Sequence, residues 1–303
     1  MKVLIIGLGS IAQKHIQAIK SIRPDSDIYA LRSSVNAGVI ADVTNIYTTD
    51  ELTNKNFDFI IISNPTALHY QTITGLLEYN IPLFIEKPLF DNLMADELIE
   101  GIKQKGILTY VACNLRFLEC LLFAKRFLEG KRINEVNIYC GSYLPNWRPG
   151  VNFRESYSAN KDLGGGAHID LIHEIDYAYW LFGHPDQVKK TFRSVSSLAI
   201  NATDYANYLL AYDQFSVNIV LNYYRKDSKR ELEIVFEDGT CLVNLLNNTV
   251  TWNEEIVFES AQKIINTYTS QMKYFIDGIA NKNLSLNTAA EAYQVLKICL
   301  QEE

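Results

Sequence analysis

The sequence predicts an α/β protein of two domains: a doubly wound parallel sheet, followed by an α/β domain with an open, mainly antiparallel sheet. The first 110 or so residues alternate short apolar runs with amphipathic segments, which is typical of βαβ units. From residue 187 to 258, short β-rich runs follow one another without long helices, which indicates antiparallel pairing. We expect domains at 1–115 and 116–303, and leave open that the last helix packs back on the first domain.

Apolar runs and their breakers set the expected elements of the first domain. The expected strands are Lys2–Ile6, Ile28–Leu31, Asp58–Ile62, Leu83–Ile85 and Thr109–Cys113. The expected helices are Ile11–Ile22, Leu68–Glu78 and Asn92–Gln104. The first helix ends before Pro24 because proline cannot continue it. The near-continuous isoleucines before Ser63 predict a strand buried on both faces.

The second domain is expected to mix four helices with short strands. The helices are Phe117–Leu128, Asp170–Leu181, Ser260–Ile279 and Thr288–Leu300. The strands are Glu135–Leu144, Leu209–Tyr212, Ser216–Asn222, Arg230–Phe236, Cys241–Asn244 and Thr249–Trp252. Turn residues such as Glu237-Asp238-Gly239 and Asn247-Asn248 separate the last strands, as in a meander.

Composition and charge exclude several classes of function. The net charge of −7 gives no bulk attraction to nucleic acid. The longest apolar runs are strand-sized, and the first strand begins at Lys2, so we expect neither a membrane span nor a signal peptide. The five cysteines form no CxxC pair and do not cluster with histidine, so we expect reduced thiols, no metal site and a cytoplasmic location.

A glycine motif stands where the first strand meets the first helix. Gly7-Leu8-Gly9-Ser10-Ile11-Ala12 is GxGxxG with alanine in the last position. The first glycine permits a tight turn, the second lets a pyrophosphate approach the backbone, and the helix N-terminus offers free N–H groups. The context predicts a Rossmann dinucleotide site with Gly7, Gly9, Ser10, Ile11 and Ala12 as cofactor-binding residues.

The end of the second strand indicates which dinucleotide is preferred. An acid there would bind the ribose hydroxyls of NAD, but the sequence has Leu31-Arg32-Ser33-Ser34. Arg32 can stack on adenine and pair with a 2′-phosphate, and Ser33 or Ser34 can donate to that phosphate. NADP is therefore preferred over NAD. The alternative is that Arg32 is a surface residue that ends a strand.

Several further motifs recur in a fixed order. They are Ser63-Asn64-Pro65-Thr66 with His69, Glu86-Lys87-Pro88, Gly164-Gly165-Gly166-Ala167-His168-Ile169-Asp170-Leu171-Ile172-His173-Glu174-Ile175-Asp176, and Trp180-Leu181-Phe182-Gly183. With Gly7 and Gly9, these motifs resemble the glucose-fructose oxidoreductase/inositol dehydrogenase (Gfo/Idh/MocA) family over essentially the whole chain. The segments around Asn114 and Tyr143 resemble a branch associated with bacterial surface-polysaccharide clusters.

The resemblance implies hydride transfer between a nicotinamide and an alcohol or ketone of a sugar-like substrate. It makes Lys87, Asp170 and His173 the catalytic candidates. Lys87 follows a strand at the ligand-binding edge of the sheet, where it can stabilise alkoxide charge. His173 is the expected general base, and Asp170 orients it or relays the proton. Many relatives separate this pair by four residues rather than three, but both spacings share one helix face.

The remaining candidates concern the cofactor and the substrate. The resemblance adds Ser63, Asn64, Pro65, His69, Glu86 and Lys87 to the cofactor site. The expected substrate-binding residues are Asn114, Arg116, Tyr143, Trp147, Arg148, Arg154, Tyr157 and His168, with Lys161 near them. Aromatic faces stack on sugars and arginines bind carboxylates or phosphates, so an acidic or nucleotide-linked sugar would suit. Alternatively, these residues form an ordinary loop with solvated arginines. Asp176 is expected to be a structural partner.

Two other functions remain open on the sequence alone. One is a catalytically idle dinucleotide-binding scaffold or sensor. The other is redox-assisted glycoside cleavage, in which the hydride returns in each turnover and no reduced cofactor accumulates. In all cases, the exposed sheet face of the second domain predicts a homodimer or homotetramer.

Overall fold

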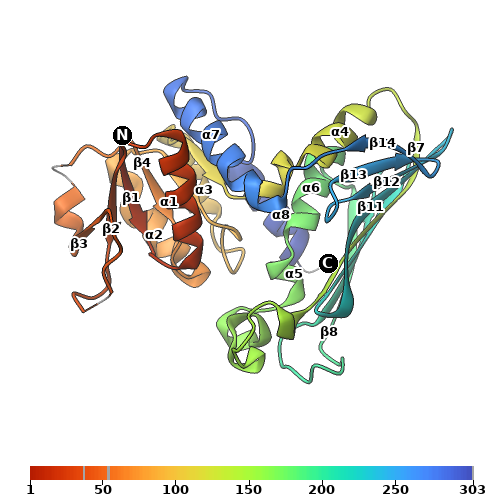
Figure 1. Ribbon diagram of the computed structural model, residues 1–303, viewed down its shortest axis with the longest axis horizontal. Helices are drawn as coiled ribbons and strands as arrows, with labels where there is room; N and C mark the ends of the chain where they lie inside the picture. Colours follow the sequence, from red (N-terminus) through yellow and green to blue (C-terminus); the bar gives the residue numbers. More distant parts are fainter. Residues whose placement is uncertain (37, 53–54, 302–303) are drawn as a thin grey trace. The chain divides into compact units, whose positions relative to one another are not determined.

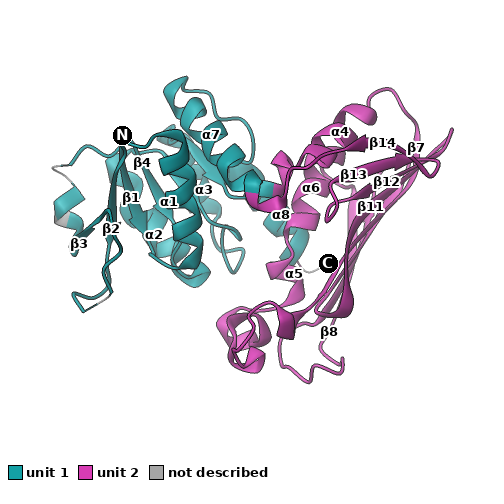
Figure 2. Cartoon of the chain, in the orientation of Figure 1, with its two compact units in different colours: residues 1–114, 266–300 teal, residues 115–265, 301–303 magenta. Residues whose placement is uncertain are grey.

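The computed structural model describes residues 1–36, 38–52 and 55–301, which form two compact units (Figure 2). Unit 1 comprises residues 1–114 and 266–300, and unit 2 comprises residues 115–265 with Gln301. The division differs from the expected second domain of 116–303, because the segment 266–300 belongs to unit 1. Both closing helices, not only the last one, pack with the first unit.

Unit 1 contains a six-stranded sheet in the order β3-β2-β1-β4-β5-β6, and every neighbouring pair is parallel. The strands are β1 Lys2–Ile6, β2 Asp27–Leu31, β3 Val43–Ile46, β4 Phe59–Ile62, β5 Leu83–Ile85 and β6 Thr109–Val111. This order is that of the Rossmann fold, as expected, with the reversal of strand order between β1 and β4. Strand β3 was not predicted, because this edge strand contains the polar residues Thr44 and Asn45.

Five α-helices belong to unit 1 in its described part. They are α1 Ser10–Ile22, α2 His69–Leu76, α3 Asp96–Gln104, α7 Thr267–Ala280 and α8 Ala289–Leu300 (Figure 1). Helix α7 packs beside α1, and α8 contacts α3 and β6. Phe275 of α7 stands edge-on to Phe59 of β4 and Phe84 of β5, at 5.1 and 5.4 Å between ring centroids. This aromatic contact explains why the chain end joins unit 1. The helix expected from Ser260 begins only at Thr267.

Unit 2 contains an eight-stranded sheet in the order β14-β13-β12-β11-β7-β10-β9-β8. The strands are β7 Ile133–Tyr143, β8 Gln187–Arg193, β9 Tyr205–Ala211, β10 Ser216–Asn222, β11 Tyr224–Phe236, β12 Thr240–Asn244, β13 Thr249–Trp252 and β14 Glu255–Glu259. Only β7 and β10 pair in parallel, so the prediction of a mainly antiparallel sheet is confirmed. The largely exposed edge strands β8 and β14 were not predicted.

The helices of unit 2 lie on one face of this sheet (Figure 1). They are α4 Glu119–Phe127, α5 Ala167–Asp170 and α6 His173–Phe182. Alternate residues of β7, among them Val136, Ile138 and Cys140, are buried. The expected single helix from Asp170 is two helices, because the chain turns at Leu171 and Ile172. Between β7 and α5 the chain forms short 3-10 turns at Leu144–Asn146, Phe153–Glu155, Tyr157–Ala159 and Lys161–Leu163.

The described residues contain neither a membrane-spanning helix nor a cluster of metal ligands. None of the helices in residues 1–36, 38–52 and 55–301 is long and apolar enough to cross a membrane. The same residues contain no group of three or more His, Cys, Asp or Glu side chains placed to hold a metal ion. All five cysteines are buried thiols, and burial raises the pKa of Cys120 and of Cys140 to about 12, so neither thiol is activated.

Candidate active site

Gly7 is required by the packing of two neighbouring loops. The turn after β1 lies directly against the turn after β4, so a Cβ on Gly7 would come within 2.2 Å of the Asn64 backbone nitrogen. Gly7 also has φ +93, a conformation that disfavours side chains. Ser63 donates a 2.8 Å hydrogen bond from its hydroxyl to the Gly7 carbonyl, which fastens the two turns together.

Gly9 has no such requirement from the protein itself. It caps α1 with an extended φ of −89, and a Cβ there would meet nothing within 4 Å. Neither strain nor crowding explains the glycine, but a pyrophosphate seated at the helix N-terminus would need that space. Ala12, by contrast, is fully buried and lets α1 pack closely on the sheet. These residues therefore fit a bound dinucleotide.

A cavity of about 690 Å³ opens in unit 1 beside this turn. It is lined by Ile6, Gly7, Leu8, Leu31, Arg32, Ser33, Tyr47, Thr48, Thr49, Asn64, Pro65 and Leu68. The cavity brings together five of the predicted cofactor residues from the ends of β1, β2 and β4. Tyr47, Thr48 and Thr49 were missed because they follow β3, which the sequence did not reveal.

Arg32 is held at this cavity by its own neighbours. Its Nη1 donates to the carbonyl of Gly38 and to Oδ1 of Asn45, both at 3.0 Å. Arg32 as a whole residue is half-buried. Arg32 is thus a cation held by two hydrogen bonds beside this cavity.

Two predicted cofactor residues have structural partners instead. His69 is 1% exposed, and its Nδ1 and Nε2 lie 3.0 Å from the carbonyl oxygens of Leu89 and Asn64. Burial lowers the pKa of His69 despite these carbonyls. Glu86 places Oε1 2.5 Å from Nε2 of His15, a buried residue of α1 that belongs to no recognised motif. The ring nitrogens of His69 therefore face the backbone of two loops.

The catalytic candidate of unit 1 follows β5 directly. Lys87 is half-buried, and its backbone N–H donates to Oε2 of Glu86 at 3.1 Å. The Lys87–Pro88 peptide bond is cis. Lys87 therefore lies at the carboxyl end of a parallel strand, the edge of the sheet where open α/β folds bind ligands.

The catalytic candidates of unit 2 do not share a helix. Asp170 ends α5 and His173 begins α6, since Leu171 leaves helical geometry at φ −97 and ψ 30. The expectation that both side chains share one helix face is therefore wrong. Asp170 instead accepts a 2.5 Å hydrogen bond through Oδ2 from the hydroxyl of Tyr223, which follows β10 and was not predicted. Tyr223 is fully buried, and burial together with the Asp170 charge raises its pKa.

The glycine run before α5 is packed within the protein. A Cβ on Gly165 would lie 2.0 Å from the Tyr157 carbonyl, and one on Gly166 would lie 2.6 Å from Cε1 of His168. Close internal packing, rather than ligand approach or flexibility, accounts for both glycines. The ring of His168 also lies 4.9 Å from that of Phe192, and burial lowers its pKa to about 4.

The predicted substrate residues divide into an accessible set and a buried set. Trp147 is 39% exposed and packs edge-on to Tyr223 at 5.2 Å. Arg148 lines a small cavity with Trp147, and exposed Arg154 donates to the Leu198 carbonyl at 3.1 Å. Half-buried Tyr143 ends β7, and the hydroxyl of half-buried Tyr157 donates to the Gly164 carbonyl at 2.9 Å.

The buried set does not suit substrate binding. Arg116 has no exposed side-chain surface and forms two hydrogen bonds to Asp176, at 2.7 and 2.8 Å. Asn114 is 4% exposed and donates to Thr267 Oγ1 at 2.6 Å. A buried guanidinium needs its carboxylate partner, so the polar groups of Arg116 and Asn114 are engaged within the protein. Asp176 is that structural partner.

Comparison with known proteins extends this picture. A family model described as "Oxidoreductase family, NAD-binding Rossmann fold" matches residues 1–113, and the model "GFO/IDH/MocA C-terminal domain" matches residues 121–242. Together the two matches span most of the chain.

Curated relatives match over shorter stretches. An uncharacterized oxidoreductase of Bacillus subtilis is 28% identical over 59% of this chain and 53% of its own length. The levoglucosan dehydrogenase of Pseudarthrobacter phenanthrenivorans is 30% identical over 40% of this chain and 32% of its own. The myo-inositol 2-dehydrogenase of Thermotoga maritima is 23% identical over 65% and 59%. The aligned part thus spans about half the length of the first curated relatives, and less in some.

Solved structures share the fold over nearly the whole chain. A UDP-N-acetylglucosamine 3-dehydrogenase from Acidithiobacillus ferrooxidans superposes with a TM-score of 0.81 at 18% identity, over 99% of this chain and 96% of that one. A levoglucosan dehydrogenase in complex with NADH and levoglucosan gives 0.84 at 16%, over 99% and 95%. The chain belongs to the Gfo/Idh/MocA family of oxidoreductases, with an NAD-binding Rossmann fold.

Proposed function

We propose that this protein is an NAD(P)-dependent dehydrogenase or reductase acting on a CH–OH group of a sugar-like substrate. The observation that carries the proposal is the empty space around Gly9, at the N-terminus of α1 and beside the cavity that Gly7, Arg32 and Asn64 line. The packing of the protein alone does not require a glycine at position 9. A bound dinucleotide would require it, because its pyrophosphate would occupy the space that a side chain would fill. When bound, the nicotinamide supplies or accepts the hydride.

The protein's own groups then handle charge and protons. Lys87 would stabilise negative charge on the substrate oxygen through its ammonium group. His173 would take the hydroxyl proton during oxidation and return it during reduction. Asp170, anchored by Tyr223, would orient His173 or relay that proton.

The substrate class we propose is an acidic or nucleotide-linked sugar. Trp147 offers an exposed ring on which a sugar can stack, and Arg148 and Arg154 are exposed cations on the same loop. Levoglucosan, inositol and UDP-N-acetylglucosamine appear in the names of related dehydrogenases, which supports a polyhydroxylated substrate.

For the cofactor we propose a preference for NADP. No acid stands at the end of β2, and Arg32 and Ser33 line the cavity in its place. The hydrogen bonds from Arg32 to Gly38 and Asn45 preorganise its guanidinium for a 2′-phosphate.

The test is a titration with NADPH and with NADH, followed by nicotinamide fluorescence, on the wild type and on Arg32→Asp, Lys87→Ala and His173→Ala. We expect tighter binding of NADPH, loss of that preference in Arg32→Asp, and retained binding in the other two variants. Tighter NADH binding would overturn the NADP preference alone. If neither nucleotide binds at micromolar concentration, the dehydrogenase proposal fails. Binding without turnover of any anionic sugar would favour the idle scaffold.

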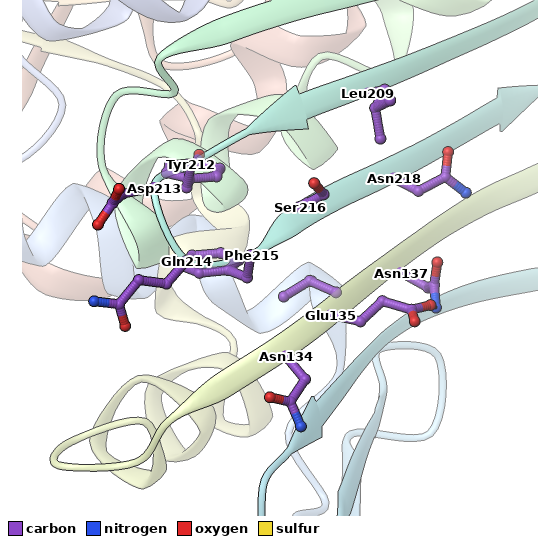
Figure 3. A pocket seen from close by; sticks show the side chains of 11 residues that line it. Asn134, Glu135, Asn137, Leu209, Tyr212, Asp213, Gln214, Phe215, Ser216 and Asn218 are labelled. Carbon is purple, nitrogen blue, oxygen red and sulfur yellow. The ribbon is translucent and has the colours of Figure 1, made fainter.

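We also propose that the open face of the unit 2 sheet binds a second copy of the chain. Figure 3 shows Leu209, Asn218, Asn137 and Glu135 on neighbouring strands β9, β10 and β7, around a hollow of about 670 Å³. Leu209 is 43% exposed on this face, and the helices of unit 2 cover the opposite one. Light scattering should give a dimer or tetramer that Leu209→Lys weakens. A monomer at all concentrations would exclude this arrangement.

A further inference from the structure

The segment Glu86–Leu89, which carries Lys87, is held at both ends by buried histidines. At its start, His15 of α1 is completely buried, with Nε2 2.5 Å from Oε1 of Glu86. The other oxygen of the same carboxylate accepts the backbone N–H of Lys87 at 3.1 Å. Because Glu86 is only 8% exposed, its carboxylate forms a buried bridge from the His15 ring to the Lys87 backbone.

The far end of the segment is tied to a different element. The ring of His69, at the start of α2, lies between the carbonyl of Leu89 and the carbonyl of Asn64, at 3.0 Å from each. Asn64 belongs to the loop after β4 that packs on Gly7 and lines the cavity of unit 1. A neutral imidazole has one N–H and donates to one of these carbonyls, while the buried ring as a whole fills the space between the Lys87 segment and a wall of the dinucleotide cavity.

Packing alone does not explain His15. Its ring stands edge-on to Phe84 at 4.8 Å and tilted to Tyr268 at 5.9 Å, surroundings in which an apolar side chain would pack equally well. Its Nδ1 is buried and has no hydrogen-bond partner within the described part of the chain. A buried polar atom without a partner is costly. The bond to Glu86 is the contact that an apolar residue could not replace.

We propose that His15 and His69 are positioning residues that hold Lys87 in register with α1, which follows the glycine turn, and with the Asn64 loop, which lines the dinucleotide cavity. The inference rests on the proposed role of Lys87 and adds that its position is set by the same elements that bind the cofactor. In this arrangement the lysine backbone cannot shift without breaking a buried contact to one of those elements.

The test measures how freely Lys87 reacts, without any substrate or cofactor. The full chain is treated with a trace of acetic anhydride, and peptide mass spectrometry gives the acetylation of Lys87 relative to the exposed Lys103 and Lys273. The variants are His15→Leu, which deletes the bond to Glu86, and His15→Gln, whose amide can still donate to it. Ile19→Val is the matched control, because Ile19 is completely buried one turn along the same helix.

We expect His15→Leu to raise the relative labelling of Lys87 by about threefold to tenfold, as the segment opens locally. His15→Gln should restore labelling to within about twofold of the wild type, and Ile19→Val should leave it unchanged. His69→Leu should act in the same direction as His15→Leu. If His15→Leu does not fold, Glu86→Leu removes the same contact from the other side. It should raise the relative labelling of Lys87 to the same extent.

Unchanged Lys87 labelling in the apolar variants would overturn the inference, as would an equal increase in Ile19→Val or no rescue by His15→Gln. The proposed function has a separate failure, the absence of nicotinamide binding by the wild type. If the wild type binds a dinucleotide but Lys87 labelling is unchanged in the apolar variants, only the positioning role of the histidines is ruled out. If labelling changes but the wild type binds no dinucleotide, the dehydrogenase proposal is ruled out. The histidines then remain structural links around Lys87.

Discussion

The hydroxyl of Tyr223 donates a hydrogen bond of 2.5 Å to Oδ2 of Asp170, joining the end of β10 to the end of α5. Trp147 packs edge-on against the same phenol ring at 5.2 Å. A fully buried tyrosine thus contacts both a catalytic candidate and an exposed residue of the proposed substrate loop. This shared contact gives the loop a physical connection to Asp170.

Replacing Tyr223 by phenylalanine should destabilise the protein and impair catalysis. A hydrogen bond to a carboxylate is lost, so we expect the free energy of unfolding to fall by about 1–3 kcal/mol. Because Asp170 loses its anchor, kcat should fall while KM changes little. Urea denaturation and steady-state kinetics with an identified sugar check both effects.

Tyr177→Phe provides the control for Tyr223→Phe. Tyr177 is also fully buried in unit 2, but its hydroxyl has no hydrogen-bond partner among the described residues. Removing that hydroxyl should leave stability unchanged or raise it by about 1 kcal/mol. Equal destabilisation by both variants would mean that the Tyr223–Asp170 bond adds nothing.

The two motif glycines should respond to alanine in opposite ways. Gly7→Ala forces a Cβ to 2.2 Å from the Asn64 nitrogen at a positive φ, so the variant should lose several kcal/mol of stability, of order 3 or more. Gly9→Ala meets no protein atom within 4 Å and should melt like the wild type. If a pyrophosphate occupies that space, the second variant should bind NADPH and NADH at least about tenfold more weakly. Wild-type affinity in Gly9→Ala would place the cofactor elsewhere.

The sequence predicted those parts of the fold whose signals are local. The apolar run at β4 and the glycine turn before α1 lie within a few residues, and both stand where expected. The polar edge strand β3 and the exposed strand β8 form because a neighbouring strand offers hydrogen bonds, which no local pattern records. The break between α5 and α6 was missed because neither proline nor glycine marks Leu171.

The same distinction applies to the site. Motif residues such as Gly7 and Arg32 line one cavity because the ends of parallel strands converge. Burial was not readable from residue type, so Arg116 looked like a substrate ligand although it pairs with Asp176 sixty residues away. His15 and Tyr223 belong to no expected motif. Their roles come from partners 71 and 53 residues distant, which only the folded chain reveals.

The buried pair of Arg116 and Asp176 should matter far more than an exposed pair. Asp176→Asn leaves a buried guanidinium without its countercharge and should cost about 3–5 kcal/mol of stability. Asp277→Asn breaks the ion pair with Lys273, whose members are both about half or more exposed, and should cost less than about 0.5 kcal/mol. Chemical denaturation of both variants compares them directly, and similar costs would contradict the burial argument.

His168 should make the protein sensitive to mild acid. Burial lowers its pKa from 6.5 to about 4, so between these pH values the unfolded chain binds a proton that the folded chain does not. Stability therefore falls as the pH drops through this window, and is fully retained above pH 6.5. At pH 5 the shift lowers the free energy of unfolding by at most about 2 kcal/mol relative to neutral pH. The actual loss is smaller because the ring is partly exposed to solvent.

The variant His168→Gln isolates this contribution. Burial also lowers the pKa of His69, so the wild type and the variant should both lose stability in acid, the wild type more. Unfolding free energies at pH 7 and pH 5 give the difference between the two proteins. The gap between their pH dependences should be on the order of 1 kcal/mol and vanish above pH 7. Parallel curves would show that His168 titrates alike in the folded and unfolded chains, and so that its ring is not desolvated between Gly166 and Phe192.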